Sequence, residues 1–351
     1  MIPAIFGLAG LSLSADERAF FRDADPAGYI LFGRNVESRA QLRALTDELR
    51  SLQGRDQLFI CIDQEGGRVA RMKPPVWQPY PTGEAFDRLY DLAPASAIEA
   101  ARCNAEALGL DLAEAGISAD CWPSLDVRQP GAHDVIGDRA FGAEPMRVAA
   151  LGRAVLDGLA RAGVAGVIKH MPGHGRAMAD SHKELPTVTA SEAELESDLA
   201  PFRTLAHAPV GMTGHIRFTA WDDARPATQS PFVIEEIIRC RIGFGGLLLT
   251  DDLDMAALEG PVPERAARSL AAGCDLALNC WARMDDMAGI ARLCPDMGEV
   301  AAQRLDAALA VMGAPGGDTD RRLAMAEKRD ALLALAAADG GAGLSDAERR
   351  A

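Results

Sequence analysis

The sequence predicts an α/β protein that folds as a single (β/α)8 barrel of the TIM type. Short apolar segments recur eight times along the chain, and helical patterns separate them. Most of these segments are apolar on consecutive positions, which is typical of parallel strands covered on both faces. Eight strand–helix units in about 310 residues favour one closed barrel over a doubly wound sheet, which rarely needs eight regular units.

The predicted elements follow in order. The strands are placed at residues 5–10, 27–33, 58–67, 118–127, 165–173, 209–216, 245–255 and 274–280. Between them, three pairs have the spacing of a helix capping box: Ser14 with Glu17, Ser38 with Gln41, and Ser191 with Glu194. Ser230 before Pro231 offers another helix start, and Gly273 offers a helix stop before the last strand.

The end of the chain is predicted to lie outside the barrel. Residues 298–312 have the pattern of the eighth helix, so the barrel domain is expected to span residues 1–313. The segment GAPGGDTD is a turn-rich break, and an alanine-rich helix is expected after it, to about residue 338, followed by a frayed end. Residues 314–351 are therefore predicted to be a helical extension and tail, not a separate domain.

Composition narrows the classes of partner. The 351 residues are 48% hydrophobic, enough for a large core, and 36 Lys plus Arg against 51 Asp plus Glu give a net charge of −15. Such an acidic body disfavours nucleic acid and anionic membranes, so any basic site must be local. Seven scattered cysteines form no CxxC pair, and the apolar N-terminus lacks a basic leader region. We expect a cytoplasmic protein with reduced thiols and no membrane span.

Polar side chains cluster where the predicted strands end. Because the carboxyl ends of barrel strands meet at one mouth, these side chains are expected to form an enzyme active site there. In strand order they are Asp63, Glu65, Arg68 and Arg71, then Asp126, Lys169, His170, His215, Asp251, Asp252, Asp254 and Asn279.

The segment KHMPGHGRAMADSH (169–182) carries the most chemistry. Asp180 and His182 lie two residues apart on a loop, where the carboxylate can orient the imidazole as a general acid and base. A metal-dependent hydrolase is a second hypothesis, because His170, His174 and His182 are possible ligands together with Asp180. Their spacing matches no compact zinc signature, however, and HExxH is absent. A solvated loop with incidental histidines is the third interpretation.

Two further segments complete the candidate site. In GGLLLTDDLDM (245–255) an apolar strand ends in acidic residues. Burying a carboxylate costs free energy unless it is paired, so its presence there indicates a role, and Asp251 is the predicted nucleophile. Asp252 and Asp254 are expected to cap the next helix. In IDQEGGRVARM (62–72) Asp63 ends a strand near arginines, and IGDRAF adds Arg139; such groups bind sugar hydroxyls, although each arginine can also be a structural ion pair.

Together IDQEGGRV, KHMPGHG followed by DSH, and IIRCRIGFGGLLLTDD resemble the single-domain bacterial β-N-acetylglucosaminidases of glycoside hydrolase family 3, from about residue 3 to about residue 310. The resemblance implies that Asp251 is the nucleophile and that His182, assisted by Asp180, is the acid/base. It also implies that the terminal sugar is bound by Asp63, Arg71, Arg139, Lys169 and His170.

The resemblance implies a substrate and a mechanism as well. Terminal N-acetylglucosamine would leave peptidoglycan fragments with retained configuration, through a covalent intermediate. We expect a monomer that binds a small carbohydrate or muropeptide and needs no cofactor or metal.

Phosphorolysis on the same site is an alternative, because a histidine base repels phosphate less than a carboxylate does. A non-catalytic barrel that senses sugars is a further one. Anionic substrates would depend on a local basic cluster of Arg68, Arg71, Arg139 and Lys169.

Overall fold

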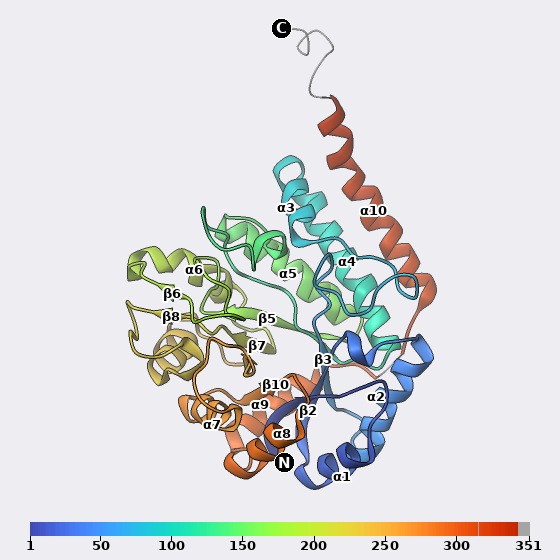
Figure 1. Cartoon of the computed structure of the whole chain (residues 1–351). Helices are drawn as coiled ribbons and strands as arrows, with labels where there is room; N and C mark the ends of the chain where they lie inside the picture. Colours follow the sequence, from blue (N-terminus) through green and yellow to red (C-terminus); the bar gives the residue numbers. More distant parts are fainter. Residues whose placement is uncertain (315, 343–351) are drawn as a thin grey trace.

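The computed structural model describes residues 1–314 and 316–342. Eight parallel strands close into a barrel (Figure 1), so the predicted fold class is confirmed. Around the barrel the strands are β1 (Ile2–Gly7), β10 (Leu276–Asn279), β9 (Leu247–Asp252), β7 (Val210–Thr213), β5 (Ala165–Met171), β4 (Ala119–Asp120), β3 (Phe59–Ile62) and β2 (Pro26–Leu31). Each corresponds to one of the eight predicted segments.

Helices surround the strands. They are α1 (Ala15–Ala24), α2 (Arg39–Gln53), α3 (Gly83–Leu92), α4 (Pro94–Glu114), α5 (Pro145–Arg161), α6 (Glu192–Thr204), the π-helix η4 (Val233–Ile242), α7 (Val262–Ala272), α8 (Met284–Leu293), α9 (Glu299–Ala310) and α10 (Thr319–Ala342). Beside the barrel, β6 (Thr187–Val188) and β8 (Arg217–Phe218) form a small parallel sheet that joins the loops after β5 and β7.

Most of the predicted helix signals are present. The capping boxes at Ser14 and Ser191 are complete. At Ser38 only half forms: the Ser38 hydroxyl accepts the Gln41 N–H, but the Gln41 side chain accepts the N–H of Glu37 instead of that of Ser38. The reason is that the Gln41 amide also donates to the backbone of Leu11, which turns it away from the helix start.

The predicted helix start at Ser230 and the predicted helix stop at Gly273 are also present. The Ser230 hydroxyl accepts the N–H of Val233 at 3.2 Å. Gly273 ends α7 in the left-handed region at φ +115°, which glycine adopts without strain. The π-helical form of η4 was not predicted, because its apolar spacing is close to that of an α-helix.

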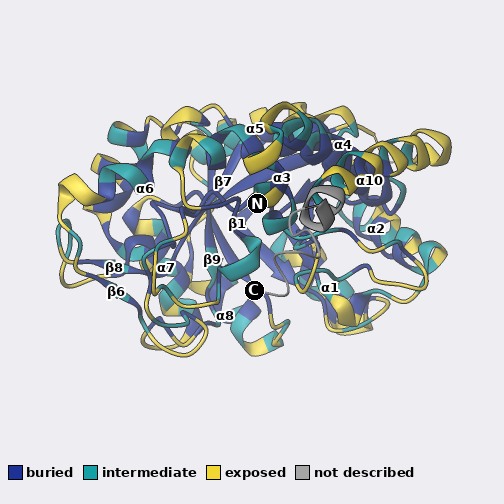
Figure 2. Ribbon diagram, turned by 90° about the horizontal axis from the view of Figure 1, so that it is seen from above, coloured by how far each residue is buried: buried dark blue, intermediate teal, exposed yellow. Residues whose placement is uncertain are grey.

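The core has two concentric parts. Side chains such as Ile5, Val167, Leu247 and Leu276 fill the barrel interior, and a larger apolar cluster lies between the strands and the helices. Figure 2 shows the consequence: the central strands are buried, and the surrounding helices expose their outer faces. All seven cysteines lie in the described part of the chain as free thiols, and six are buried. The strand ends are thus held by a packed scaffold.

The chain after the barrel continues as α10, which lies alongside α4 (Figure 1). The helix extends to Ala342, beyond the predicted end near residue 338. Residues 343–351, the greater part of the predicted frayed end, lie outside the described residues, and the division at residue 313 stays a prediction. In the part of the chain that the structure describes, no helix combines the length and the apolar character required to cross a bilayer.

Candidate active site

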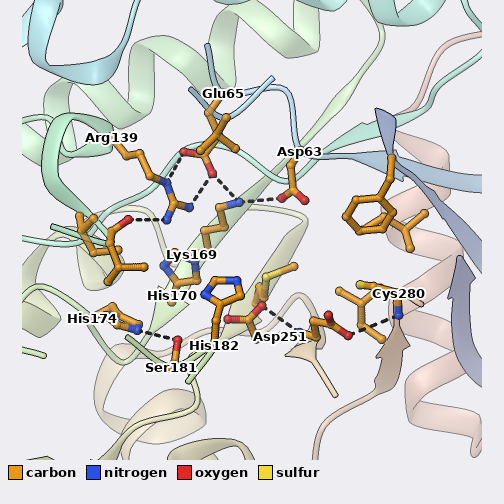
Figure 3. Close-up of a pocket in the computed structure, with 18 of the residues that line it drawn as sticks. Asp63, Glu65, Arg139, Lys169, His170, His174, Ser181, His182, Asp251 and Cys280 are labelled. Atoms are coloured by element: carbon orange, nitrogen blue, oxygen red, sulfur yellow. Dashed lines mark hydrogen bonds and ion pairs between the residues drawn. The ribbon is translucent and has the colours of Figure 1, made fainter. Parts of the chain in front are cut away.

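A cavity lies at the carboxyl ends of the strands, and Figure 3 shows charged side chains converging on it. The structure places seven of the eight predicted site residues along its wall: Asp63, Arg71, Arg139, Lys169, His170, His182 and Asp251. Asp180, the eighth, does not line the cavity but lies within hydrogen-bond distance of His182. Residues from β5 and β9 and from the loops after β3, β4 and β5 therefore meet although they lie far apart in sequence.

Asp251 is near the end of β9, where the strand leaves the apolar interior. Its Oδ1 accepts the N–H of Asp252 at 2.8 Å. Burial alone would raise the pKa of this carboxyl, but the neighbouring His170 and His215 outweigh that effect and lower the pKa below its usual value. Asp251 is therefore ionised at neutral pH, as a nucleophilic carboxylate must be.

His182 and Asp180 form a fixed pair on the loop after β5. The Nδ1 of His182 lies 2.9 Å from Asp180 Oδ1, and the same oxygen accepts the His182 backbone N–H at 3.0 Å. Burial tends to raise the pKa of Asp180, but these two bonds lower it below its ordinary value. Since an ionised carboxylate only accepts hydrogen bonds, Nδ1 carries the hydrogen, and Nε2 is left to exchange a proton at the cavity.

The loop that carries this pair is tied down at Ser181, which is buried although both of its neighbours are more exposed. The Ser181 hydroxyl lies 3.3 Å from Nε2 of His174, and its carbonyl accepts the N–H of Ala257. Burial lowers the pKa of His174 to about 4, so this histidine is neutral at working pH. His174 thus acts as an anchor for the loop.

A second cluster joins three segments on the other side of the cavity. Lys169 Nζ lies 3.0 Å from Asp63 Oδ1 and 2.7 Å from Glu65 Oε1. Arg139 donates two hydrogen bonds to Glu65, at 2.8 and 2.6 Å, and Arg71 reaches Asp63 at 3.1 Å. These ion pairs hold four sugar-binding candidates in one rigid group.

Glu65 is the centre of that cluster, and the predicted sugar-binding set did not include it. Burial would raise its pKa, but Arg139 and Lys169 lower it far below the usual value, so the carboxylate stays charged. The available signal was its position two residues after Asp63, in a strand end flanked by glycines. Its partners could not be read from the sequence, because Arg139 is 74 residues away.

His170 is oriented from inside the barrel by a buried carboxylate. Asp126 Oδ2 lies 2.7 Å from His170 Nδ1 and also accepts a hydrogen bond from Ser124. Burial raises the pKa of Asp126, but His170 and His174 more than offset this, and the pKa is lowered. The ring of His170 is therefore held in one orientation at the cavity wall, and its other nitrogen is not engaged by Asp126.

The expectation that Asp252 and Asp254 cap the next helix is wrong. That helix, α7, begins only at Val262, after an intervening loop. Asp252 Oδ1 accepts the N–H of Asp254, and Asp254 Oδ2 accepts a hydrogen bond from the Asn279 amide and the N–H of Cys280. The two carboxylates therefore tie the end of β9 to the loop after β10.

His215 also supports β9 from behind. Its Nε2 lies 3.0 Å from the carbonyl oxygen of Asp252, and its Nδ1 lies 2.8 Å from the Thr228 hydroxyl. The histidine is fully buried, and burial lowers its pKa. It therefore fixes the backbone next to Asp251.

The described residues provide no set of ligands for the metal hypothesis. Over residues 1–314 and 316–342, no group of three His, Cys, Asp or Glu side chains is arranged to bind a metal ion. The Nδ1 atoms of His170 and His182 are engaged by aspartates, and His174 is engaged by Ser181. What the described arrangement offers is an ionised carboxylate, an oriented imidazole and a charged wall.

Comparison with known proteins agrees with this chemistry. Residues 6–312 match the glycosyl hydrolase family 3 N-terminal domain. The chain is 39% identical over 326 residues to a β-hexosaminidase of Alkalilimnicola ehrlichii, covering 92% of this chain and 91% of the relative. It is 41% identical over 290 residues to a β-hexosaminidase of Methylococcus capsulatus, covering 79% and 82%. The crystal structure of NagZ from Neisseria gonorrhoeae in complex with N-trifluoroacetyl-D-glucosamine has a TM-score of 0.84 at 32% identity, covering 95% of this chain and 98% of that one.

Proposed function

Because the chain belongs to glycoside hydrolase family 3, we propose that this glycoside hydrolase removes terminal β-linked N-acetylglucosamine from peptidoglycan fragments through a covalent intermediate on Asp251. The observation that carries the proposal is the ionised Asp251 carboxylate in the same cavity as His182, which Asp180 orients. Membership of this enzyme family argues against a barrel that only senses sugars. The sugar preference is supported by the β-hexosaminidase relatives and by the ligand named for the Neisseria structure.

The reaction proceeds in two displacements. In the first, an Asp251 oxygen bonds to the anomeric carbon as the bond to the leaving oxygen breaks, and protonated His182 gives that oxygen its proton from Nε2. In the second, neutral His182 takes a proton from water, whose oxygen attacks the anomeric carbon and releases Asp251. Two inversions give net retention. Histidine suits both roles because its charge ordinarily changes between about pH 5 and 8.

The charged wall binds the terminal sugar. Asp63, Arg71, Lys169 and His170 line the cavity, and each is already held by a neighbour. Groups fixed in this way lose little conformational freedom when they bind sugar hydroxyls, so more of the interaction energy is retained in the complex. Arg139 supports them through Glu65.

Hydrolysis is favoured over phosphorolysis by the pairing of the cations in the cavity. Arg68 pairs with Asp138, Arg71 and Lys169 with Asp63, and Arg139 with Glu65. The basic cluster expected from the sequence is therefore largely neutralised by carboxylates, which leaves little excess positive charge to hold a phosphate dianion. Adding phosphate to the assay should yield free N-acetylglucosamine and no sugar phosphate; sugar 1-phosphate as the main product would favour phosphorolysis.

Replacing the nucleophile tests the proposal. Asp251→Ala should lower kcat/KM for an aryl N-acetyl-β-glucosaminide by at least about 10³-fold, because no covalent intermediate can form. Asp296→Ala, which removes a highly exposed carboxylate elsewhere, is the matched control and should retain wild-type rates. Turnover by Asp251→Ala at the wild-type rate would refute the assignment.

A further inference from the structure

Helix α10, which follows the segment matched to the family, is docked on the barrel rather than left free (Figure 1). It runs antiparallel to α4, with residues at three- and four-residue spacing turned inward. Ala326 is buried, and Met325, Leu332, Leu333 and Ala336 pack against the main apolar cluster. The helix therefore buries an apolar stripe along α4.

Charged contacts add to this packing. Arg321 donates to Glu106 at 2.8 Å, and Arg322 Nε lies 3.5 Å from Asp111. Both carboxylates are on α4 and are almost fully buried, with side chains 3% and 2% exposed. A buried carboxylate depends on its partners, so α10 helps to keep these two charges in the fold. Asp111 also pairs with Arg39 from α2.

Arg329 extends from the buried face of α10 toward the loop after β3. It is 4% exposed, and its Nη1 donates to the Asn104 side chain at 3.1 Å. Its guanidinium carbon lies 5.5 Å from the centre of the Tyr80 ring. An arginine over an aromatic ring is attracted by the ring's negative face, and more strongly where water is excluded. Arg329 is therefore a fixed support for Tyr80.

Tyr80 connects this support to the candidate sugar-binding loop. Its hydroxyl donates to Asp111 at 2.7 Å, and burial, with Asp111, raises its pKa, so the donor stays protonated. Its backbone carbonyl accepts the N–H of Gly67 at 2.8 Å. The neighbouring Gly66 packs so tightly that a Cβ there would lie 2.2 Å from the Pro81 carbonyl oxygen. The backbone of Tyr80 and Pro81 is thus in direct contact with the backbone of Gly66 and Gly67.

We infer that α10, through Arg329 and Tyr80, is a positioning element that sets the loop after β3 and with it the cavity-lining side chains Glu65 and Arg71. Glu65 directly precedes Gly66, and its N–H and that of Gly66 both donate to the Val69 carbonyl, so Glu65 is part of the same hydrogen-bonded turn as Gly66. Glu65 in turn holds Lys169 and Arg139. This inference rests on the proposed function, because its kinetic consequence is weaker binding of the sugar.

The test replaces Arg329 and separates positioning from general stability. Arg329→Ala should raise KM for an aryl N-acetyl-β-glucosaminide on the order of tenfold and change kcat less than about twofold, because the loop loses preorganisation while Asp251 and His182 are unaffected. Arg329→Lys keeps the positive charge near Tyr80 and should fall between Arg329→Ala and wild type. Lys328→Ala is the matched control, since it removes an ion pair between α10 and Glu99 of α4 without touching Tyr80.

A second measurement does not depend on turnover. Amide hydrogen exchange in a peptide covering residues 64–72 should be faster in Arg329→Ala than in wild type, because the Gly67 N–H loses a fixed acceptor; it should be unchanged in Lys328→Ala. A lower Tm with unchanged KM and unchanged exchange would overturn the inference. If wild-type protein fails to cleave the glycoside, the proposed function fails, and the exchange measurement alone decides on positioning. If Arg329→Ala does not fold, Arg329→Lys carries the same comparison.

Discussion

At the scale of single residues, the candidate site depends on carboxylates whose charge is fixed by neighbours from other segments. The placement of Asp251, His182 and Asp180 in one site was predictable, because strand ends and a two-residue spacing are local signals; their catalytic roles stay a proposal. The Glu65 contacts were not, since they join residues that only barrel closure brings together. Asp252 and Asp254 were assigned wrongly because an acid after a strand resembles a helix cap whether or not a helix follows at once.

Glu65→Gln should show what the charged cluster contributes. At pH 7 the free energy of unfolding should fall by about 3 kcal/mol, because Lys169 and Arg139 lose a buried partner. The folded-state pKa of Glu65 is depressed, so its contribution is present above its ordinary value of 4.5 and is lost as pH falls through the lower folded value.

Urea unfolding at several pH values provides the measurement. Wild type should lose stability steadily as pH falls below about 4.5, and Glu65→Gln should lose less over the same window. Glu37→Gln, at an exposed position, is the control. Equal stability of wild type and Glu65→Gln at pH 7 would show that the cluster is not stabilising.

At the scale of elements, all eight strands were predictable from consecutive apolar residues, and the starts of α1, α2, α6 and η4 from Ser and Pro signals. The π-helical form of η4 was not, because its sequence carries the apolar spacing of an ordinary helix. The contact that anchors the loop after β5 could not be predicted from the sequence either. A histidine in a glycine-rich loop suggests a ligand, and only the structure shows that His174 is neutral and lies against Ser181.

Ser181→Ala should test this anchor. Without the hydroxyl, the loop holds His182 less firmly, so kcat for an aryl glycoside should fall about tenfold with KM little changed. Ser51→Ala, on the exposed face of α2, is the control. A kcat equal to that of wild type would show that Ser181 does not contribute to positioning the acid/base.

At the scale of the whole molecule, barrel closure was predictable, but the pairing of the cations at the mouth was not. The net charge of −15 is set by composition, whereas the local basic cluster expected to offset it is largely paired with acids. Nor did the sequence indicate that α10 would dock on α4 and approach the loop after β3. Both features depend on contacts between distant segments.

The overall charge predicts how salt affects substrates. An anionic muropeptide is repelled by the acidic surface, and salt screens that repulsion over a distance that shrinks from about 30 Å at 0.01 M to about 8 Å at 0.15 M. The KM for an anionic peptidoglycan fragment should therefore fall as sodium chloride is raised over this range, and the KM for a neutral aryl glycoside should stay constant. A KM for the anionic fragment that rises with salt would indicate net attraction at the mouth.

The central claim is that Asp251 bonds to the sugar during turnover, and trapping that bond tests it most directly. A slow fluorinated N-acetylglucosaminide should inactivate the enzyme and add one sugar mass to the peptide that contains Asp251, as read by mass spectrometry. The His182–Asp180 pair should remain unmodified. A label on a different residue, or turnover of the reagent with no labelled enzyme at any time, would contradict the account.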